Sequence, residues 1–466
     1  MRRDTTKIVC TLGPSSASPD VIRKLMLAGM NVARLNFSHG THEGHARTLA
    51  NIRSIADDLQ QSVAILGDLQ GPRIRIGVLP EAIDLAEGAR LVLAHEDLAS
   101  GDEIPVTYDL GRDVQPGSAI LVDDGLISLR VEAVDGPRVE VSVRYGGLLK
   151  SNKGMNLPGV DVSAPSLTEK DLEDIPFAIE QDLDYLALSF VRKPEDILAL
   201  RELLPKGLLI VAKIEKDSAL HRIEEILKVS DAVMVARGDL GVELPFEEVP
   251  LQQKRIIGLA NRYGRPVITA TQMLESMVQH PRPTRAEASD VANAILDGTD
   301  AVMLSAETAA GLHPVLAVEA MRRIASAAER APVERGQGLD RVKAGSATVE
   351  ETIASASVTA VRLLGASVIV VFTKSGFSAR IVAARRPNVR VVVLTDNRRT
   401  YRQLALVWGV IPFLVPHCDT YEQMTELAKE CLLREGLARP GERIVVTAGV
   451  PFDVPGTTNQ LKVETV

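Results

Sequence analysis

Cysteine is scarce in this chain of 466 residues, which contains only Cys10, Cys418 and Cys431. The three cysteines are widely separated without the spacing of a metal site, and an odd number gives no complete disulfide framework. No apolar run approaches the roughly 20 residues that a membrane-spanning helix needs, and the first residues lack the apolar core of a signal peptide. We therefore expect a protein of the reducing cytoplasm that has no membrane partner.

A surplus of positive charge is also missing, since 53 Lys and Arg residues stand against 61 Asp and Glu residues and give a net charge of −8. Proteins that bind nucleic acid normally carry a basic surface, so a nucleic-acid partner is not expected. The hydrophobic fraction of 45% and the charged fraction of 24% are ordinary for a globular protein. The length is sufficient for two or three domains.

Short apolar runs alternate with amphipathic helical patterns along most of the chain. Because these runs are rich in Val and Ile and too short for helices, they indicate buried strands of a parallel sheet. Eight runs share this pattern: residues 7–12, 32–37, 63–69, 184–190, 209–214, 231–236, 266–271 and 300–305. Eight strand–helix units with right-handed crossovers predict an α/β fold that closes as a (β/α)8 TIM barrel. An open doubly wound sheet would give the same pattern and is the alternative to the barrel.

Residues 70–165 interrupt this rhythm, because their apolar residues alternate singly with polar ones, as around Leu129 and Val131. Asp-Gly pairs between the alternating stretches indicate tight turns. We therefore predict an inserted all-β domain at residues 70–165, within a barrel formed by residues 1–69 and 166–335.

Residues 331–347 are rich in Gly, Pro and charge and have no apolar period, which indicates a linker. Thr348 and Glu351 then match a capping box for a helix that Gly365 ends. Further apolar runs alternate with helical patterns beyond this helix: runs at residues 368–372, 389–394 and 443–448, and a helix at 421–435. We predict a C-terminal α/β domain at residues 345–466.

Charged side chains follow two neighbouring apolar runs. Lys213 and Glu215 lie at the end of the fifth run, and Arg237 and Asp239 follow the sixth. Two carboxylates and two cations at adjacent strand ends are costly to bury unless they pair or bind a ligand. A divalent metal on Glu215 and Asp239, facing a phosphate on Lys213 and Arg237, satisfies all four. Two ordinary salt bridges satisfy them equally well.

Five motifs in the barrel region resemble those of the pyruvate kinase family, and they occur in the order of that family. They are Asn-Val-Ala-Arg-Leu-Asn-Phe-Ser-His-Gly from residue 31, Val-Ala-Lys-Ile-Glu from 211, Met-Val-Ala-Arg-Gly-Asp-Leu-Gly-Val-Glu from 234, Ala-Thr-Gln-Met-Leu-Glu-Ser-Met from 270 and Met-Leu-Ser-Ala-Glu-Thr from 303. The family transfers a phosphoryl group from phosphoenolpyruvate to ADP in the final step of glycolysis. The resemblance covers nearly the whole chain and implies a barrel, an inserted all-β lid domain, a C-terminal α/β regulatory domain and a homotetramer.

The resemblance also implies roles for the strand-end residues. Lys213 would contact the transferring phosphoryl group and stabilise the enolate that it leaves. Glu215 and Asp239 would hold Mg²⁺ or Mn²⁺, because such hard cations prefer carboxylates and substrate oxygens. The backbone N–H groups of Gly238 and Asp239, at the start of a short helix, would bind the substrate carboxylate.

A second group of residues is implied in protonating the enolate. Thr271 would position the substrate and relay a proton from water, because a threonine hydroxyl is a poor acid at neutral pH. Ser305 and Glu307 would belong to the same relay. Without the motif, Thr271 is equally well explained as a hydrogen-bonded hydroxyl at a strand end.

Nucleotide and substrate phosphates would be held by basic residues, since guanidinium groups match phosphate oxygens geometrically. The resemblance implies this role for Arg34 and Arg75, and for Lys153, which would reach the phosphates from the lid. The lid would close over the site and exclude water. Further residues would line the nucleotide side: Asn36, Ser38 and His39.

One position departs from the family pattern. Many relatives bind K⁺ near a glutamate, where this chain has Arg73. The corresponding potassium ligands here are Asn36, Ser38, Asp68 and Leu69. We hypothesise that the Arg73 guanidinium replaces the potassium charge and makes K⁺ dispensable. The alternative is that Arg73 is a solvated residue of the lid hinge and that the K⁺ site persists.

A loop in the C-terminal domain combines hydroxyl groups, glycine and a helix start, which together favour phosphate binding. Its residues are Thr373, Lys374, Ser375, Gly376, Phe377 and Ser378. In the family this loop binds sugar-phosphate effectors, and residues 449–459 would form the opposing loop. Phe377 stands where a basic residue is common, so no particular effector is indicated. An ordinary strand–helix turn is the alternative.

Two other functions remain to be distinguished. Another barrel enzyme that forms a metal-bound enolate from a 2-oxo acid, such as an aldolase or mutase, would share the carboxylates but would not need the lid, Lys153 or Arg75. A regulatory or scaffold protein without catalysis would not need Lys213 or Thr271.

Overall fold

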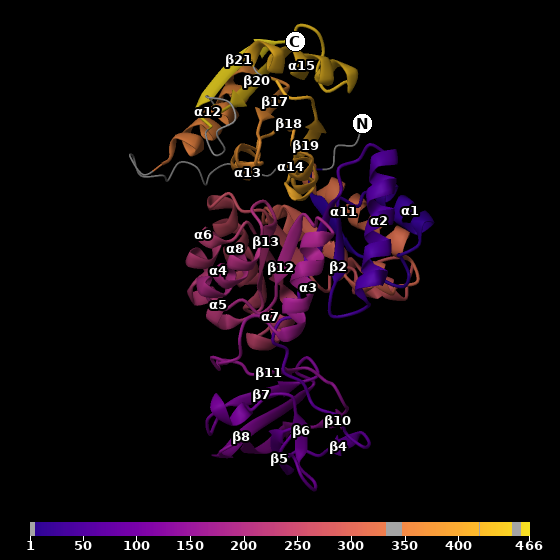
Figure 1. The fold of residues 1–466 in the computed structure, drawn as a ribbon, viewed down its shortest axis with the longest axis vertical. Helices are drawn as coiled ribbons and strands as arrows, with labels where there is room; N and C mark the ends of the chain where they lie inside the picture. Colours follow the sequence, from indigo (N-terminus) through magenta and orange to yellow (C-terminus); the bar gives the residue numbers. More distant parts are fainter. Residues whose placement is uncertain (1–4, 332–346, 419, 450–457) are drawn as a thin grey trace.

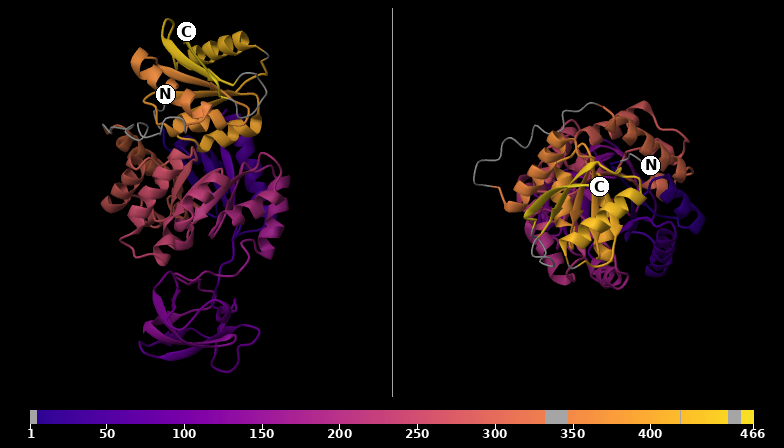
Figure 2. Two further views of the ribbon diagram at one scale, coloured as in Figure 1. Left: turned by 90° about the vertical axis from the view of Figure 1, so that its left-hand side faces the viewer. Right: turned by 90° about the horizontal axis from the view of Figure 1, so that it is seen from above.

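The computed structural model describes residues 5–331, 347–418, 420–449 and 458–466. Figure 1 shows three bodies stacked along one axis, with a barrel between a small β domain and the C-terminal domain. In Figure 2 two chain connections join the β domain to the barrel, and the C-terminal domain lies over the barrel's opposite end. Most of the predicted linker and of the predicted loop at 449–459 lies outside the described residues. Among the described helices, none has the length and apolar character needed to cross a membrane.

The central body is a closed barrel, in which every strand pairs in parallel with its neighbours in the order β1-β16-β15-β14-β13-β12-β3-β2. The prediction of a (β/α)8 barrel is therefore confirmed, and the open sheet is wrong. The strands are β1 (Lys7–Thr11), β2 (Val32–Asn36), β3 (Ala64–Asp68), β12 (Tyr185–Leu188), β13 (Leu209–Ile214), β14 (Ala232–Ala236), β15 (Val267–Ala270) and β16 (Ala301–Leu304).

Helices surround the barrel, and several of them begin at capping boxes that the sequence carries. The side chains of Thr168 and Thr284 each accept a hydrogen bond from the backbone three residues later, which satisfies an otherwise unpaired N–H. The helices are α1 (Pro19–Ala28), α2 (His42–Asp58), α3 (Glu169–Glu180), α4 (Pro194–Leu203), α5 (Asp217–His221), α6 (Ile223–Val229), α7 (Arg237–Glu243), α8 (Val249–Arg262), η2 (Glu275–Val278), α9 (Arg285–Leu296), α10 (Ala306–Ala309) and α11 (Pro314–Glu329).

The inserted domain leaves the barrel after β3 and returns before α3. It has a six-stranded mixed sheet in the order β11-β7-β8-β9-β5-β6 and a two-stranded sheet. Its own apolar cluster, which includes Leu129, Val131 and Val141, lies on the face that alternation predicts. Its elements are β4 (Ile83–Leu85), β5 (Arg90–His95), β6 (Ile104–Val106), η1 (Leu110–Arg112), β7 (Ala119–Val122), β8 (Ile127–Asp135), β9 (Arg138–Tyr145), β10 (Gly147–Leu149) and β11 (Met155–Asn156).

The C-terminal domain has a five-stranded sheet in the order β19-β18-β17-β20-β21. The predicted first helix is confirmed, with the Thr348 capping box at its start and Gly365 in the left-handed conformation at its end. Two strands were not predicted, β19 and the antiparallel β21. The elements are α12 (Val349–Leu364), β17 (Val368–Phe372), α13 (Phe377–Ala384), β18 (Arg390–Thr395), α14 (Arg398–Gln403), η4 (Leu404–Leu406), β19 (Val410–Leu414), α15 (Tyr421–Arg434), β20 (Arg443–Ala448) and β21 (Gln460–Thr465).

The C-terminal domain closes the amino end of the barrel. Ala405 and Leu406 of η4 belong to the same buried cluster as residues inside the barrel, such as Val9 and Met234. The buried hydroxyl of Tyr185 donates to the Gln403 carbonyl at 2.7 Å. This end of the barrel is therefore filled with apolar side chains, and the carboxyl end, which faces the lid domain, is the end left for polar chemistry.

Candidate active site

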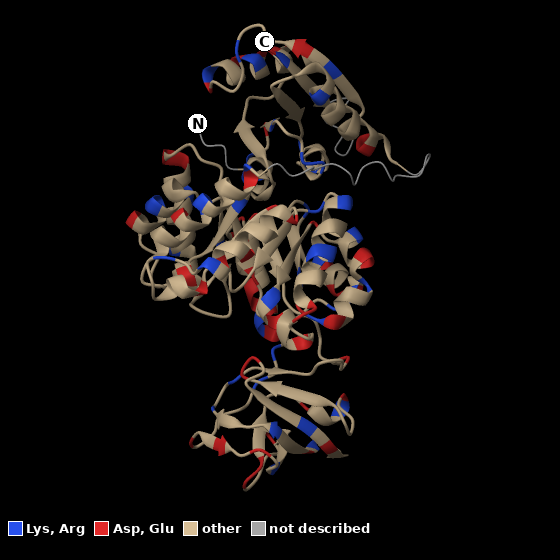
Figure 3. Cartoon of the chain, turned by 180° about the vertical axis from the view of Figure 1, so that it is seen from behind, with Lys and Arg blue, Asp and Glu red and all other residues tan. Residues whose placement is uncertain are grey.

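Polar residues gather at the carboxyl ends of the barrel strands, where Figure 3 shows acidic and basic residues mixed on the side facing the lid domain. Active sites of (β/α)8 enzymes lie at this end. Lys213 Nζ lies 3.0 Å from Glu215 Oε1 and 3.2 Å from Asp68 Oδ1, so the ends of β13 and β3 meet at one ammonium. Arg34 from β2 bonds to the other Asp68 oxygen at 2.7 Å.

The electrostatics of this cluster follow from burial and charge. Burial disfavours the Lys213 ammonium, but the Asp68 and Glu215 carboxylates outweigh that effect and raise its pKa. Burial likewise opposes the charge of Asp68, yet Lys213 and Arg34 hold its pKa below the ordinary value. The pKa of Glu215 is raised by its own burial and by Asp239, against the opposing effect of Lys213. Glu215 and Asp239 are therefore close enough to repel, as two carboxylates arranged for a cation would be.

A pocket lies between the lid and the barrel beside these carboxylates. It is lined by, among others, Asp239, Phe190, Arg192, Lys216 and Arg73. Within the described part of the chain, no group of three or more His, Cys, Asp or Glu side chains could hold a metal ion. A cation on the two carboxylates would take its other ligands from substrate and water, which is the binding mode that Mg²⁺ prefers.

Thr271 lies against the start of α7. Its Oγ1 accepts a hydrogen bond from the Gly238 amide at 2.7 Å and donates to the Ala270 carbonyl at 2.7 Å. Thr271 and Gln272 both have positive φ values, of 68° and 53°. Non-glycine residues in this region carry strain, which often accompanies function.

Arg237 does not fit the phosphate site that its position in the sequence suggested. Its guanidinium donates to the Thr271 carbonyl at 2.7 Å and pairs with Asp290 at 2.6 Å. These contacts favour the alternative of an ordinary salt bridge for Arg237 over a phosphate role. Arg237 instead holds the strained turn after β15 in place.

Ser305 and Glu307 meet at the end of β16. Glu307 is buried, and its carboxylate accepts hydrogen bonds from the Ser305 amide at 2.6 Å and from the Leu274 amide at 3.1 Å. Burial raises the pKa of Glu307. The buried Ser305 Oγ has no hydrogen-bond partner among the residues that the structure describes. An unpaired buried hydroxyl is costly, so a substrate or water is the natural partner for it.

The residues predicted on the nucleotide side form two groups, one after β2 on the barrel and one in the lid. The Asn36 side chain accepts a hydrogen bond from the Ser38 amide at 3.2 Å, and His39 is exposed on the loop that follows. In the lid, Lys153 pairs with Asp123 at 2.7 Å and Arg75 donates to the Asn152 carbonyl at 3.1 Å. The structure therefore brings Lys213, Glu215, Asp68 and Arg34 together but leaves the two lid cations bonded within the lid.

Arg73 lies in the first connection to the lid, where it is exposed and its guanidinium packs beside Gly154. Burial, followed by the nearby Arg73 charge, lowers the pKa of Arg75. Asp68 is already neutralised by two other cations, and the Leu69 carbonyl accepts a hydrogen bond from Ser189 at 2.7 Å.

The predicted phosphate loop is a turn between β17 and α13. Gly376 has φ of 75°, and its amide donates to Thr373 Oγ1 at 3.0 Å. Lys374 pairs with Asp396 at 2.8 Å, and Ser378 bonds to Thr458. The Ser375 carbonyl accepts from a buried arginine, Arg380, at 3.3 Å. The loop is thus preorganised and has cations beside it.

Three residues of the site were missed from the sequence: Ser189, Phe190 and Arg192. Lys213 Nζ donates to Ser189 Oγ at 2.7 Å, and the Phe190 amide donates to Glu215 Oε2 at 2.6 Å. Both residues lie at the end of a buried run, as Lys213 does, and that position was the available signal.

Clustered cations and two adjacent carboxylates at the carboxyl end of a (β/α)8 barrel are typical of metal-assisted enzymes that act on phosphate or enolate groups. Comparison with known proteins narrows this class. A family model described as pyruvate kinase, barrel domain, matches residues 2–318, and one described as pyruvate kinase, alpha/beta domain, matches residues 351–464.

Curated proteins named pyruvate kinase are similar over nearly the whole chain. The one from Geobacillus stearothermophilus is 50% identical, and the match covers 99% of this chain and 80% of the relative. Those from Staphylococcus haemolyticus and Staphylococcus aureus strain MRSA252 are each 46% identical with the same coverage. The chain belongs to the pyruvate kinase family of phosphotransferase enzymes.

Proposed function

We propose that the chain transfers the phosphoryl group of phosphoenolpyruvate to ADP, giving pyruvate and ATP, as the final step of glycolysis. The observation that carries this proposal is the Lys213 ammonium, held between Asp68 and Glu215 at the carboxyl end of the barrel. Phosphoryl transfer needs positioned positive charge more than covalent help, and a fixed buried ammonium supplies it.

Each residue has a role in this reaction. Lys213 neutralises the phosphoryl group as it leaves and then stabilises the enolate oxygen. Arg34 contacts the phosphate, and the amides of Gly238 and Asp239 bind the substrate carboxylate once substrate displaces the Thr271 hydroxyl from Gly238. Thr271 positions the substrate and passes a proton to the enolate carbon.

The proton relay continues through Ser305 and Glu307. The unpaired Ser305 hydroxyl supports this role, because it can exchange a proton with an ordered water. Glu215 and Asp239 hold Mg²⁺ or Mn²⁺, which supplies positive charge to the phosphate oxygens.

The lid completes the nucleotide site. Arg75 and Lys153 turn from their lid partners toward the nucleotide phosphates when the lid closes, and Asn36, Ser38 and His39 line the nucleotide on the barrel side. Closure excludes water from the phosphoryl group, which prevents its hydrolysis.

A lactate dehydrogenase-coupled assay tests the reaction. Pyruvate formation from phosphoenolpyruvate should require both ADP and a divalent cation, and EDTA should abolish it. Pyruvate formation without ADP would favour another enolate-forming barrel enzyme. The absence of turnover with every nucleotide and metal tried would favour a scaffold protein. Varying Mg²⁺ against Mn²⁺ and ADP against GDP in the same assay identifies the preferred partners.

Arg73 makes potassium dispensable in this proposal. The support is that Arg73 lines the same pocket as Asp239, so its guanidinium brings a positive charge to the site. The charged member of the potassium ligand set of Asn36, Ser38, Asp68 and Leu69 is Asp68, which Arg34 and Lys213 already neutralise. Activity in buffers free of Na⁺ and K⁺ should change less than about twofold when K⁺ is added, and Arg73→Glu should acquire a K⁺ requirement. Activation of the unaltered enzyme by tenfold or more would contradict the proposal.

Regulation and assembly are proposed from surface features. The loop from Thr373 to Ser378 would bind a sugar phosphate or nucleotide, supported by its helix start and its neighbouring cations. A homotetramer is supported by exposed apolar residues such as Phe246, of which 84% is exposed, and by β21, which is an edge strand among the residues that the structure describes. The scarcity of cysteine in the chain supports a cytoplasmic location. Light scattering tests the assembly, and a shift of the phosphoenolpyruvate saturation curve by sugar phosphates or AMP tests the loop.

A further inference from the structure

The Lys213 ammonium has three oxygen neighbours, and they differ in kind. Two are carboxylate oxygens at 3.0 and 3.2 Å, which attract the charge but hardly fix its direction. The third is the Ser189 hydroxyl at 2.7 Å, which is closest and has hydrogen-bond geometry. Ser189 is 2% exposed, so no water competes strongly for this bond. The hydroxyl, rather than the carboxylates, sets where the ammonium points.

Ser189 is itself held in one orientation. Its hydroxyl donates to the Leu69 carbonyl at 2.7 Å, so its lone pairs are left to accept from Lys213. Leu69 is the first residue after β3 and begins the connection to the lid. A chain of two hydrogen bonds therefore runs from the lid connection to the proposed catalytic ammonium.

The packing around Ser189 supports the same link. A Cβ atom on Gly71 would lie 2.8 Å from the Ser189 Cβ, so this connection passes too closely for any side chain at Gly71, whose φ is 68°. The Gly71 amide donates to the buried Asp171 carboxylate at 3.2 Å. The first lid connection is thus pressed against Ser189 and held there.

The second lid connection meets the same turn. Arg192, three residues after Ser189, donates to the Ala164 carbonyl at 3.0 Å and also to the Val162 carbonyl. Between them, the Phe190 amide donates to Glu215, and Phe190 has a strained φ of 54°. Residues 189–192 therefore contact both connections to the lid and both members of the Lys213–Glu215 pair.

We propose that Ser189 is a positioning residue that aims the Lys213 ammonium and joins it to the first lid connection. This inference rests on the proposed function for its kinetic consequence. A lysine displaced by about 1 Å loses alignment in the transition state, which costs up to about 100-fold in rate. Ground-state binding of the substrate also uses Arg34 and backbone amides, so it should change less.

The test replaces the hydroxyl and measures kinetics. Ser189→Ala should lower kcat about 30-fold with less than a threefold change in KM for phosphoenolpyruvate. Ser189→Cys, which keeps a weaker hydrogen-bonding group, should fall between Ser189→Ala and the unaltered enzyme. The matched control is Ser230→Ala: Ser230 is equally buried, bonds to the Ile226 carbonyl at 2.7 Å and lies at the opposite end of the barrel. The control should keep its kcat within twofold.

Amide hydrogen exchange provides a readout that does not depend on activity. Ser189→Ala should speed exchange of the Gly71 amide by about tenfold, and Ser230→Ala should leave it unchanged. An unchanged kcat in both Ser189 variants overturns the aiming of Lys213, and unchanged exchange at Gly71 overturns the link to the lid. If the unaltered enzyme makes no pyruvate, the proposed function fails, and the exchange measurement still tests the link.

Discussion

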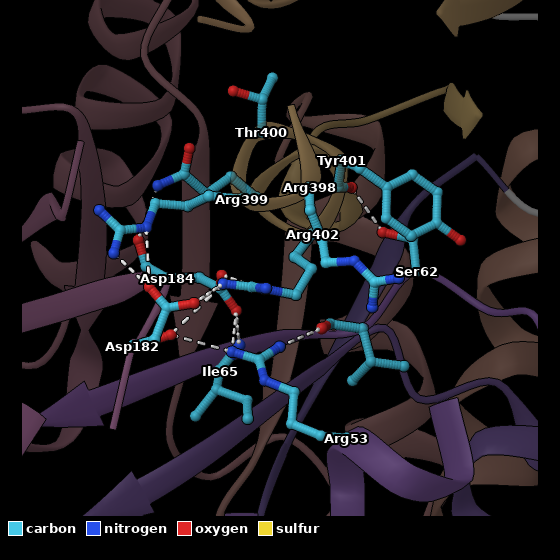
Figure 4. Close-up of polar contacts among 12 residues, drawn as sticks. Arg53, Ser62, Ile65, Asp182, Asp184, Arg398, Arg399, Thr400, Tyr401 and Arg402 are labelled. Atoms are coloured by element: carbon cyan, nitrogen blue, oxygen red, sulfur yellow. Dashed lines mark hydrogen bonds and ion pairs between the residues drawn. The ribbon is translucent and has the colours of Figure 1, made fainter. Parts of the chain in front are cut away.

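The two ends of the barrel both carry buried ion pairs, yet their polar atoms are satisfied to different degrees. At the amino end, Asp184 accepts from Arg53 at 3.0 Å, from Arg402 at 2.7 Å and from the Ile65 amide at 2.8 Å (Figure 4). At the carboxyl end, Asp68 Oδ1 has an ammonium 3.2 Å away but no hydrogen bond in the described structure. Both oxygens of Asp184 therefore accept hydrogen bonds, whereas one oxygen of Asp68 keeps an unused acceptor position at the site.

The backbone differs in the same way. Strained positive φ values occur after two strands at the carboxyl end, at Phe190 after β12 and at Thr271 and Gln272 after β15. At the amino end, Asp182 is also strained, but its carboxylate bonds to Arg399 and Arg402 from α14 (Figure 4). Strain persists where the surrounding structure holds it, as the arginines do at Asp182, and at functional sites it is often part of the mechanism. The comparison therefore assigns stability to the amino end and chemistry to the carboxyl end.

The largest effect should come from Lys213→Met, which removes the central cation of the carboxyl end. Activity should fall by about 1,000-fold, because the transferring phosphoryl group loses its fixed positive charge. The melting temperature should change by no more than a few degrees, because Asp68 keeps its bond to Arg34 and the buried Glu215, whose pKa burial already raises, can take up a proton. Steady-state kinetics and calorimetry measure the two effects. Lys254→Met, which removes an exposed lysine, is the control, and a large loss of stability in Lys213→Met would break the division between the two ends.

The converse effect should come from Asp184→Asn at the amino end. Asp184 is fully buried between Arg53 and Arg402, and removing the charge of one partner in a buried ion pair typically costs about 3 kcal/mol. The kcat of the folded protein should stay within twofold. Denaturant unfolding measures the loss, and Asp57→Asn, which breaks an exposed pair with Arg398, should change stability by less than about 0.5 kcal/mol. Equal effects of the two substitutions would contradict the comparison.

The carboxyl end was largely accessible from the sequence because its residues are tied to strand ends. Lys213, Glu215 and Asp239 follow apolar runs, and strand ends of a parallel barrel meet on one rim. Arg237 shows the limit of this reasoning, because its position gives no information on where a long side chain points. Ser189 occupies the same kind of position but carries an uncharged side chain, so nothing separated it from an ordinary turn residue.

The amino end could not be predicted from local patterns. Arg402 and Asp184 are 218 residues apart, and nothing near either residue indicates that they pair. Counting the strand–helix units predicted the barrel strands. It did not predict that Leu406, from the C-terminal domain, would pack into the amino end of the barrel. The strand β21 is different, because Leu461 and Val463 alternate with polar residues and that signal was present in the sequence.

A smaller effect is expected at Ser305, where one substitution should affect stability and activity differently. Ser305→Ala removes a buried hydroxyl that lacks a partner among the described residues, so stability should stay constant or rise by up to about 1 kcal/mol. If the hydroxyl relays a proton to the enolate, kcat should fall about tenfold. Thr308→Val is the control, since the buried Thr308 hydroxyl is satisfied by the Thr11 carbonyl at 2.8 Å. A loss of stability in Ser305→Ala would show that the hydroxyl serves the fold.

The smallest effect concerns the pH dependence of the amino end. Burial opposes the charge of Asp182, but bonds to Arg399 and Arg402 hold its pKa below the ordinary value of 3.8. A carboxylate with a lowered pKa contributes stability above its ordinary pKa and loses that contribution as pH falls through the lowered value. Asp182→Asn should therefore cost less than about 1 kcal/mol at pH 7, because half of the side chain is exposed. The difference from the unaltered protein should shrink below pH 4 in denaturant unfolding. A difference that stays constant down to pH 3 would mean that the arginines contribute by packing rather than by charge.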